Sequence, residues 1–345
     1  MRTTQGSFKA EEKLAILKSH FLEKVAVSEL CEKHGLQGTQ FYQWQKYFFE
    51  NGAKALTSDN KMKLPPNTSL PFFAYGIFKP GQLCFFRIKD FVKEFHAGTV
   101  NGSLKERDGI PLLITDESGE GIKGHLIHFR NGEEESAYNR IVEIEPDEVY
   151  QWKEVKVNKV NEGTLANANA LIGRRYQKGS SDLEHEVEWD GINDPLFKQG
   201  IEEISKILEE NSEFDWDYKS LFRLEMGYML LWSAIERYAG LKYHFGKEVM
   251  KNVHQVAAEK KFADSLHKNV KNKRDIFSTN LDKYTLDTDD PKKSIDYYYQ
   301  VRSNAVHRGK GVERDFEILK TSLEELLAIF NDLLDEAFPE RRKES

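Results

Sequence analysis

An arginine and a histidine stand close together near the C-terminal end of the chain, in the run Arg302-Ser-Asn-Ala-Val-His307. The surrounding residues have a helical pattern, and at this spacing two side chains on a helix project near one another, just over one turn apart. An arginine can hold a phosphate group through two hydrogen bonds, and a histidine can transfer a proton near neutral pH. The pair therefore has the chemistry to cleave RNA without a metal ion. The alternative is a structural pair, held by an acid such as Glu236.

The bulk composition bounds the class of protein that could carry such a site. A chain of 345 residues favours two or three domains. It is 31% charged and 39% hydrophobic, which indicates a well hydrated protein with enough apolar residues for real cores. No run approaches the roughly 18 apolar residues of a membrane span, and the N-terminus lacks the apolar stretch of a signal peptide. We therefore expect a cytoplasmic protein without membrane contact.

Cysteines, charge and missing motifs narrow the class further. Cys31 and Cys84 lie in apolar segments and cannot form a disulfide framework, so we expect two small buried side chains. The net charge is −7, and only residues 1–63 are positive, with 10 basic against 7 acidic residues. That excess does not predict strong nonspecific binding to nucleic acid. Because the sequence has no metal-ligand cluster, phosphate-binding loop or dinucleotide motif, we expect no metal and no cofactor.

Patterning divides the chain into three expected domains. Residues 1–57 have a helical pattern, whereas residues 58–71 are polar, contain three prolines and are typical of a linker. Residues 72–191 hold short β-rich runs between Gly and Asp turns, and residues 198–338 are again helical. The expected fold class is multidomain α+β, with an all-α head, a mixed β-barrel in the middle and an all-α bundle at the end.

Individual elements can be expected within the last two domains. The clearest strand patterns lie at 72–77, 122–129 and 154–160. The expected helices of the bundle are 198–210, 218–238, 247–258, 292–307 and 312–338. The second of these helices has a broad apolar face, formed by Leu221, Leu224, Tyr228, Leu231, Ile235 and Tyr238.

Three helices are expected in the head. The first spans 10–21, and the second spans 28–34 and ends at Gly35, a residue typical of helix C-termini. The third is capped by Thr39 and runs to 49. Two helices joined by a tight glycine-containing turn form a helix-turn-helix.

The runs 27–35 and 39–46 resemble the DNA-binding head of insertion-sequence transposases. That family has a Phe-Tyr-x-Trp run in its recognition helix, which corresponds here to Phe41, Tyr42 and Trp44. We expect these three aromatic side chains to lie in the core of the head. No acidic catalytic triad follows in the expected context, so transposition itself is not expected.

The same resemblance assigns the polar residues of the third helix to DNA. It implies that Gln40, Gln43 and Gln45 approach the bases, because glutamine can form two hydrogen bonds with adenine. Lys46 is the one basic residue in the central part of this helix, where the family usually has several. A protein-interaction module is the alternative.

Five segments of the middle domain follow one another in a recognisable order. They are 73–81, 99–104, 110–113, 122–127 and 144–152. In that order they resemble the γ-glutamylcyclotransferase-like (AIG2-like) family over residues 72–191. The resemblance implies a small mixed barrel, in which the α-amine of a γ-glutamyl group attacks the γ-carbonyl and 5-oxoproline leaves.

The family's binding loop falls at Tyr75 to Phe78. By resemblance, Tyr75, Gly76, Ile77 and Phe78 bind the α-carboxylate and amine of the substrate, and Tyr150 is a further substrate-binding residue. Ile77 stands where the family commonly has Thr or Ser, and Phe78 where it commonly has Leu. The missing hydroxyl removes one possible ligand contact.

The family also uses one glutamate as general base and acid, placed a few residues before a tyrosine and a strand. Glu145, five residues before Tyr150, is the best match, and Glu143 is the second candidate, expected on the same face. One carboxylate can take a proton from the attacking amine and return it to the departing nitrogen. A solvated acidic surface is the alternative for this acid-rich stretch, and a binding-only barrel is the alternative for the domain.

The last domain resembles the HEPN superfamily. The resemblance rests on the run 232–236 and on Arg302 and His307 ahead of a terminal amphipathic helix. It implies a homodimer in which His307 is general acid and base, Arg302 clamps the phosphate and Glu236 orients one of them. Nuclease members often have Asn straight after the Arg, where this chain has Ser303.

The basic residues of 268–274 either follow an RNA backbone or form a solvated helix face. Two functions therefore remain open, with a γ-glutamyl compound, DNA and RNA as candidate partners. The first is a cyclotransferase-like enzyme that releases 5-oxoproline. The second is a HEPN-type ribonuclease in defence against phage or plasmids, with the barrel as a sensor or modifier. A catalytically inert DNA-binding regulatory assembly is the third possibility.

Overall fold

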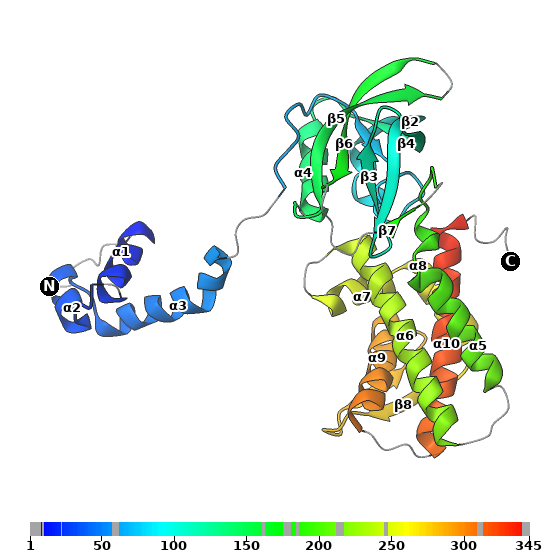
Figure 1. Cartoon of the computed structure of the whole chain (residues 1–345). Helices are drawn as coiled ribbons and strands as arrows, with labels where there is room; N and C mark the ends of the chain where they lie inside the picture. The colour runs from blue at the N-terminus through cyan, green and yellow to red at the C-terminus, as the bar shows by residue number, and fades with distance from the viewer. Residues whose placement is uncertain are drawn as a thin grey trace. The chain divides into compact units, whose positions relative to one another are not determined.

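The computed structural model describes residues 8, 10–21, 23–56, 62–145, 147–160, 163–174, 181–183, 186–211, 217–244, 248–308 and 313–339. The chain forms two compact units, residues 1–61 and residues 62–345. The first is a helical head, and the second combines a β-barrel with a helical bundle (Figure 1). This is the multidomain α+β fold that the sequence predicts. None of the described helices is both long enough and apolar enough to cross a membrane.

The head consists of α1 (Ala10–Phe21), α2 (Val27–His34) and α3 (Gly38–Leu56). Gly35 ends α2 in the left-handed conformation at φ 65°, and the Leu36 N–H donates to the Cys31 carbonyl at 2.8 Å. The expected cap is shifted, because α3 begins at Gly38 and Thr39 already lies in its first turn. A small core of Ile16, Leu17, Leu30, Leu36 and Phe41 holds the three helices together.

Among the described residues, seven strands and one helix make up the barrel. The strands are β1 (Phe72–Ala74), β2 (Val92–Arg107), β3 (Ile110–Thr115), β4 (Glu120–Phe129), β5 (Tyr150–Lys159), β6 (Leu165–Gly173) and β7 (Ser181–Asp182). The helix α4 (Glu134–Ile144), which the patterning did not predict, lies between β4 and β5. Two short 3₁₀ turns, Phe85–Arg87 and Lys89–Phe91, precede β2.

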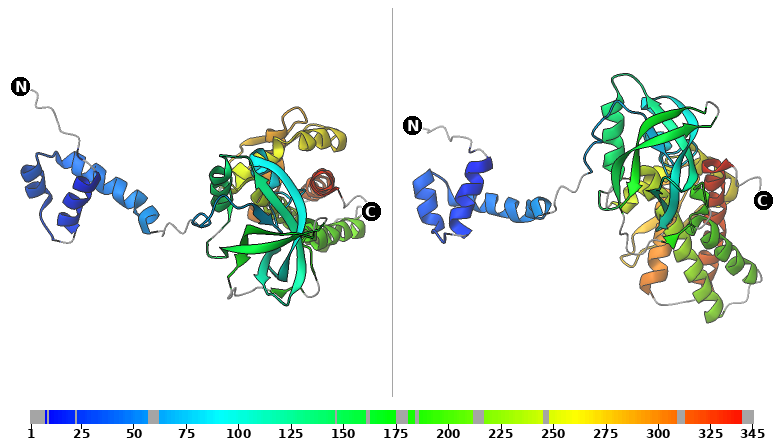
Figure 2. Two further views of the ribbon diagram at one scale, coloured as in Figure 1. Left: turned by 90° about the horizontal axis from the view of Figure 1, so that it is seen from above. Right: turned by 45° about the horizontal axis from the view of Figure 1, so that its top comes forward.

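Strand pairing closes the barrel. The strands run in the order β3-β2-β4-β1-β6-β5, and β5 pairs again with β2 through Gly98↔Lys159 and Thr99↔Asn158. The β1–β6 pair is parallel and the other pairs are antiparallel, so the barrel is mixed, as expected (Figure 2). Gly98 allows the close approach, because a Cβ there would lie 2.5 Å from Val157 Cγ1.

The barrel begins earlier in the chain than its expected boundary at residue 72. Met62, within the expected linker, is buried in the barrel core. The Trp152 indole N–H donates to the Lys63 carbonyl at 2.8 Å. The segment that precedes β1 is therefore part of the barrel's packing.

The helical bundle contains more elements than expected. It consists of a 3₁₀ turn (Gly191–Asn193), a π-helical turn (Leu196–Gly200), α5 (Ile201–Glu210), α6 (Tyr218–Tyr243), α7 (Val249–Ala257), α8 (Lys260–Asn269), β8 (Arg274–Phe277), β9 (Lys283–Leu286), α9 (Pro291–Arg308) and α10 (Glu313–Ala337). The helix α8 and the β8–β9 hairpin were not predicted. All six residues of the expected apolar face of α6 are buried, and α6 and α10 lie side by side in Figure 1.

Candidate functional site

The expected cyclotransferase residues lie around one small cavity in the barrel. It is lined by Phe72, Phe73, Ala74, Tyr75, Gly76, Ile77, Phe78, Ile110, Pro111, Glu145, Tyr150 and Leu171. Its volume is about 20 Å³, which is the room that a single water molecule needs. Every binding residue inferred from the family resemblance is therefore present at this cavity, together with its best-matching glutamate.

Glu145 is the only ionisable carboxyl group on the described wall of the cavity. It follows the last residue of α4 in an extended conformation (φ −90°, ψ 128°), and its N–H closes the helix on the Ile141 carbonyl at 3.0 Å. The side chain is 7% exposed, and we find no donor or cation paired with its carboxylate among the described residues. Burial raises the pKa of Glu145 from 4.5 to about 8. A carboxyl group in this state can exchange a proton near neutral pH.

Glu143 does not share this environment. It lies in the last turn of α4, is exposed, and forms an ion pair with Arg140 at 3.3 Å. The expectation that Glu143 and Glu145 lie on one face is wrong, because residues two apart share a face only on a strand, and Glu143 lies in the helix α4. The solvated acidic surface proposed as an alternative describes Glu143 but not Glu145.

Two tyrosine hydroxyls fix the walls of the cavity. The Tyr75 hydroxyl donates to the Leu171 carbonyl at 2.7 Å and accepts from the Leu113 N–H at 3.1 Å. The Tyr150 hydroxyl donates to the Pro111 carbonyl at 3.0 Å. Burial raises the pKa of both phenols, so both remain neutral donors. These hydroxyls hold the backbone of opposite walls together.

The loop after β1 is also tied to the barrel. The Lys79 N–H donates to the Gly76 carbonyl at 2.9 Å, and the Cys84 N–H donates to the Ile77 carbonyl at 3.0 Å. Ile77 and Phe78 are buried. Gly76 faces Pro111 closely, because a Cβ on Gly76 would lie 3.0 Å from Pro111 Cγ.

Sequence reasoning missed a buried lysine beside this loop. Lys79 is 5% exposed, and its ammonium group donates to Glu188 Oε1 at 2.9 Å and to the Trp189 carbonyl at 2.8 Å. A Lys in the Gly/Pro-rich loop was the available signal, but its acceptors lie more than a hundred residues away in the chain. The pair anchors the loop to the segment that leads into the bundle.

A buried cysteine and histidine meet where the barrel contacts α6. The Cys84 thiol donates to the Leu241 carbonyl at 2.7 Å and lies 3.2 Å from His244 Nε2. Burial raises the pKa of Cys84 and lowers that of His244 to about 4. Both groups are therefore neutral at pH 7, and the contact is structural. Cys84 is fully buried, as expected, whereas Cys31 is half-buried.

In the head, the exposed face of α3 differs from the expected set. Phe41 is buried and Trp44 packs against the core, but Tyr42 is 57% exposed. The exposed side chains follow the helical period, as Thr39, Tyr42, Gln43 and Lys46. The expectation that all three aromatics are core residues is therefore wrong for Tyr42.

The three glutamines of α3 have different environments. Gln43 is exposed and Gln40 is half-buried. Gln45 turns its amide inward, and its Oε1 atom is buried without a hydrogen-bond partner among the described residues. Of the glutamines assigned to DNA, Gln43 is the best placed to reach a groove.

Arg302 lies on α9 against aromatic side chains. Its guanidinium group is 5.4 Å from the Tyr299 ring centre, and Tyr299 in turn contacts Trp232 edge to face at 5.5 Å. Its Nε atom is buried without a hydrogen-bond partner, and within the described part of the chain no carboxylate, including that of Glu236, forms an ion pair with it. The side chain of His307 lies outside the described residues.

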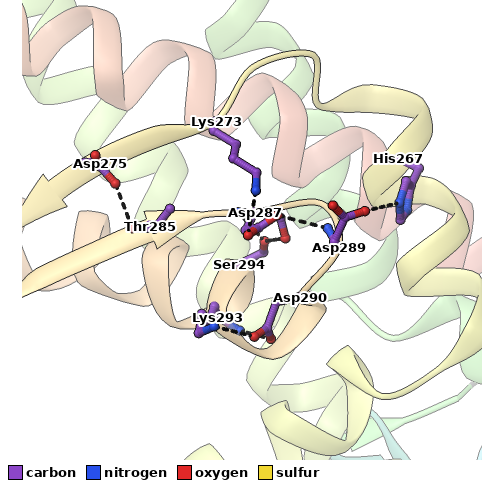
Figure 3. A network of polar contacts seen from close by, with 9 residues as sticks. All are labelled: His267, Lys273, Asp275, Thr285, Asp287, Asp289, Asp290, Lys293 and Ser294. Carbon is purple, nitrogen blue, oxygen red and sulfur yellow. Dashed lines mark hydrogen bonds and ion pairs between the residues drawn. The ribbon is translucent and has the colours of Figure 1, made fainter.

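A polar network fixes the start of α9 (Figure 3). The Asp290 carboxylate accepts from the Lys293 N–H at 3.0 Å and caps the helix. The Ser294 hydroxyl donates to the Asp287 carbonyl at 2.6 Å and accepts from the Asp287 N–H at 3.0 Å. His267 of α8 reaches Asp289 at 3.5 Å. These contacts fix the N-terminal turn of α9, the helix that carries Arg302.

Three of the four basic residues of 268–274 are engaged within the protein, and the fourth, Lys271, is exposed. Lys268 pairs with Asp332 at 3.1 Å and Lys273 with Asp287 at 2.9 Å. Arg274 donates to both carboxylate oxygens of Glu325. These residues do not form one helix face, because α8 ends at Asn269 and β8 begins at Arg274. This charge run favours structural ion pairs over a track for RNA.

No group of three or more His, Cys, Asp or Glu side chains with the arrangement of a metal site occurs among the described residues.

Residues 2–64 match the transposase family model of the helix-turn-helix type. The match covers the head and the first residues of the segment that follows it. No curated protein is detectably similar to the chain. Among solved structures, the chain is similar to an AIG2-like protein from Mus musculus, with 17% identity, a TM-score of 0.30, and coverage of 35% of this chain and 88% of that chain.

Proposed function

We propose that the barrel is a γ-glutamylcyclotransferase-like enzyme that releases 5-oxoproline from a γ-glutamyl amide. The observation that carries this proposal is Glu145: a buried carboxyl group without a partner among the described residues, on a cavity that Tyr75, Gly76 and Tyr150 also line. A structural glutamate would be expected to have a donor or a cation beside it, because an unpaired buried carboxylate is costly. Its raised pKa suits a group that both takes and returns a proton.

The reaction needs one such group. The substrate α-amine attacks the γ-carbonyl carbon, a new C–N bond closes a five-membered ring, and the original amide C–N bond breaks. The Glu145 carboxylate takes the proton that the attacking amine loses and gives it to the departing nitrogen, so protons balance over the cycle. Ring closure is intramolecular, and the remaining task of the protein is to position the chain of the substrate.

The test is 5-oxoproline release from γ-glutamyl amines, γ-glutamyl dipeptides and glutathione by the full-length protein. Release should disappear in Glu145→Gln, which keeps the shape of the side chain but cannot transfer the proton. Glu143→Gln is the matched control, because Glu143 is exposed and paired with Arg140, and it should keep wild-type activity. Full activity of Glu145→Gln would refute the assignment. No release from any substrate would leave the barrel as a binding module.

The head is proposed to bind duplex DNA through the exposed face of α3. The transposase-type helix-turn-helix supports this, as does the exposure of Gln43 and Lys46. The head has one Lys on this part of the helix, so binding should be modest and strongly weakened by salt. A gel shift at low salt on random and selected duplexes is the test, and no shift on any duplex would exclude this role.

RNA cleavage by the bundle, as a homodimer, is the second candidate. The observation that favours it is Arg302, whose guanidinium lies on Tyr299 without a carboxylate partner among the described residues. An arginine in this state is available to an external phosphate. The test is metal-free cleavage of single-stranded RNA by wild type and by Arg302→Ala and His307→Ala.

The homodimer has its own support. On α6, Tyr218, Phe222 and Met226 recur at every fourth residue and are 56–68% exposed. Phe222 and Met226 line one apolar groove together with Ala305 of α9. A defence role would follow from RNA cleavage, and unchanged phage plating after loss of the gene would count against it.

A further inference from the structure

The turn between β2 and β3 is held by the helical bundle. Arg237 of α6 donates from Nε to Asp194 Oδ2 at 2.9 Å, and its Nη2 donates to the main-chain carbonyl of Asp108 in the turn. Asp194 is 3% exposed and also accepts from the Leu196 N–H at 3.0 Å, at the start of the bundle. One arginine therefore joins the barrel turn to a buried carboxylate of the bundle.

The turn fits this contact closely. Asp108 and Gly109 form a two-residue turn with φ of 52° and 74°, the conformation that favours Asp-Gly. A Cβ on Gly109 would lie 2.6 Å from Asp194 Oδ2 and 3.1 Å from Arg237 Nη2. The turn can thus approach the carboxylate only because its second residue has no side chain.

The two residues after the turn form one wall of the Glu145 cavity. Ile110 and Pro111 both line it. The Pro111 carbonyl accepts from the Tyr150 hydroxyl at 3.0 Å, and its ring faces Gly76. The contact of Arg237 with Asp108 is therefore only two residues away from the cavity wall.

At least one wall of this cavity has to move before a glutamyl group can enter. The cavity holds about 20 Å³, and a glutamyl group is several times larger than the water molecule that this volume admits. The opposite wall, Phe72 to Ala74, is paired on both sides, with β4 and with β6. Pro111 has no N–H to donate to a neighbouring strand, and it stands at the beginning of β3. The segment 110–111 pairs with one strand only, through Arg107 and Glu106 of β2, so it has less strand pairing than β1.

We propose that Ile110 and Pro111 are a movable cover over the Glu145 cavity, and that the helical bundle holds this cover closed through Arg237 and Asp194. Arg237 is a positioning residue in this scheme, because it acts through the Asp108–Gly109 turn and touches nothing in the cavity. The bundle thereby controls access to the barrel. The scheme does not depend on which ligand the cavity takes.

Hydrogen–deuterium exchange of the full-length protein tests the cover directly. Arg237→Gln removes the contact, and Gly109→Ala pushes the turn away from Asp194. In both variants the amides of residues 106–113 should exchange at least about tenfold faster than in wild type. The exchange rates of the bundle amides should be unchanged. Wild-type exchange rates in this hairpin, or an increase spread over the whole bundle, would overturn the proposal.

Two controls isolate the contact. Asp108→Asn keeps the main-chain carbonyl that Arg237 contacts, and Asn tolerates the left-handed conformation. Arg223→Gln removes another arginine of α6, one that pairs with Glu210 inside the bundle. Both should keep wild-type exchange in residues 106–113, and faster exchange in either would overturn the proposal.

A binding measurement separates this proposal from the proposed reaction. The association rate of 5-oxoproline, followed by intrinsic fluorescence, should rise at least about threefold in Arg237→Gln over wild type. An unchanged association rate with measurable binding would overturn control of access. If no protein binds or releases 5-oxoproline but the hairpin responds in exchange, the cover stands and the cyclotransferase proposal fails.

Discussion

Glu143 and Glu145 are two residues apart, but α4 ends between them, so that Glu143 faces solvent and Glu145 is buried at the cavity. On a continuing helix, residues this close would differ in direction by about 200°. Here the helix ends at Ile144, and Glu145 follows it in an extended conformation and is buried at the cavity. The last turn of a helix therefore decides which of two neighbouring carboxyl groups acquires a perturbed pKa.

The first prediction concerns the pH dependence of 5-oxoproline release. Burial raises the pKa of Glu145 to about 8, and its ionised form is the general base. The rate should therefore increase about tenfold per pH unit below pH 8 and level off above it. Initial rates between pH 6 and pH 9 measure this, with Glu143→Gln as the control that keeps the profile. A profile that levels off near pH 5 would contradict the assignment.

The second prediction concerns stability and follows from the same shift. The pKa of Glu145 is about 8 in the folded protein and 4.5 in the unfolded chain, so the unfolded chain loses this proton first. Glu145 therefore stabilises the fold fully below about pH 4.5, and this contribution is lost as pH rises toward 8. Between pH 5 and pH 8 the free energy of unfolding should fall by roughly 3–4 kcal/mol more in wild type than in Glu145→Gln.

Urea unfolding at the two pH values measures this difference, because all other titrating groups are common to both proteins. Equal changes in the two proteins would show that Glu145 is ionised in the folded state at pH 5. Such a result would also remove the basis for the predicted pH dependence of the rate.

How far the sequence predicts the site depends on how local each contact is. The run from Tyr75 to Phe78, together with Glu145 and Tyr150, could be placed by the order of motifs, and the structure brings these residues to one cavity. The choice of Glu145 over Glu143 needed the end of α4, a helix that the β-rich patterning around it concealed. Its buried positions Ala137, Tyr138 and Ile141 have the spacing of a helix face, but they are few and stand between strand patterns.

The contacts that close the cavity could not be predicted. Arg237 is one of many charged residues on α6, and its acceptor in the turn is a main-chain carbonyl 129 residues away. Because every residue has a main-chain carbonyl, the sequence does not show which one accepts this hydrogen bond. The incorrect prediction for Tyr42 has a related cause. An aromatic residue in a helical run is usually assigned to the core, and only the burial of its neighbours on the helix shows that Tyr42 lies on the exposed face.

The third prediction concerns the DNA-facing side of α3. Lys46→Ala should weaken duplex binding and reduce the slope of log affinity against log salt by about 1, as expected for one lost phosphate contact. Gln43→Ala should weaken binding by about 1 kcal/mol or more at the preferred site alone. Gel shifts over a salt series measure both. Equal binding by wild type and both variants would exclude this face.

Gln45 supplies the matched control for that series. Its Oε1 atom is buried without a partner, so Gln45→Leu removes an unsatisfied acceptor and should keep or raise the melting temperature of the head. DNA binding should be unchanged. A loss of binding in a folded Gln45→Leu protein would return this residue to the DNA interface.

The fourth prediction contrasts two ion pairs of the bundle. Arg274 and Glu325 are 26% and 11% exposed and form two hydrogen bonds, and the Tyr298 hydroxyl also donates to Glu325 at 3.0 Å. Arg274→Ala leaves a buried carboxylate and should cost about 3 kcal/mol. Lys268→Ala, at a pair whose lysine is 66% exposed, should cost less than about 1 kcal/mol. Denaturant unfolding compares them, and equal costs would contradict the difference in burial.

The fifth prediction concerns the contact of the Arg302 guanidinium group with the Tyr299 ring. If the bundle cleaves RNA, Arg302→Ala should abolish cleavage, and Tyr299→Leu should reduce it about tenfold, because the loss of roughly 1 kcal/mol or more of cation–π contact leaves the guanidinium unpositioned. Glu236→Gln should have no effect, since Glu236 forms no ion pair with Arg302 among the described residues. Cleavage of a labelled RNA in a chelator measures all three. Wild-type cleavage in a folded Arg302→Ala protein would show that the phosphate is held elsewhere, whereas loss of cleavage in Glu236→Gln would support the pairing that the structure disfavours.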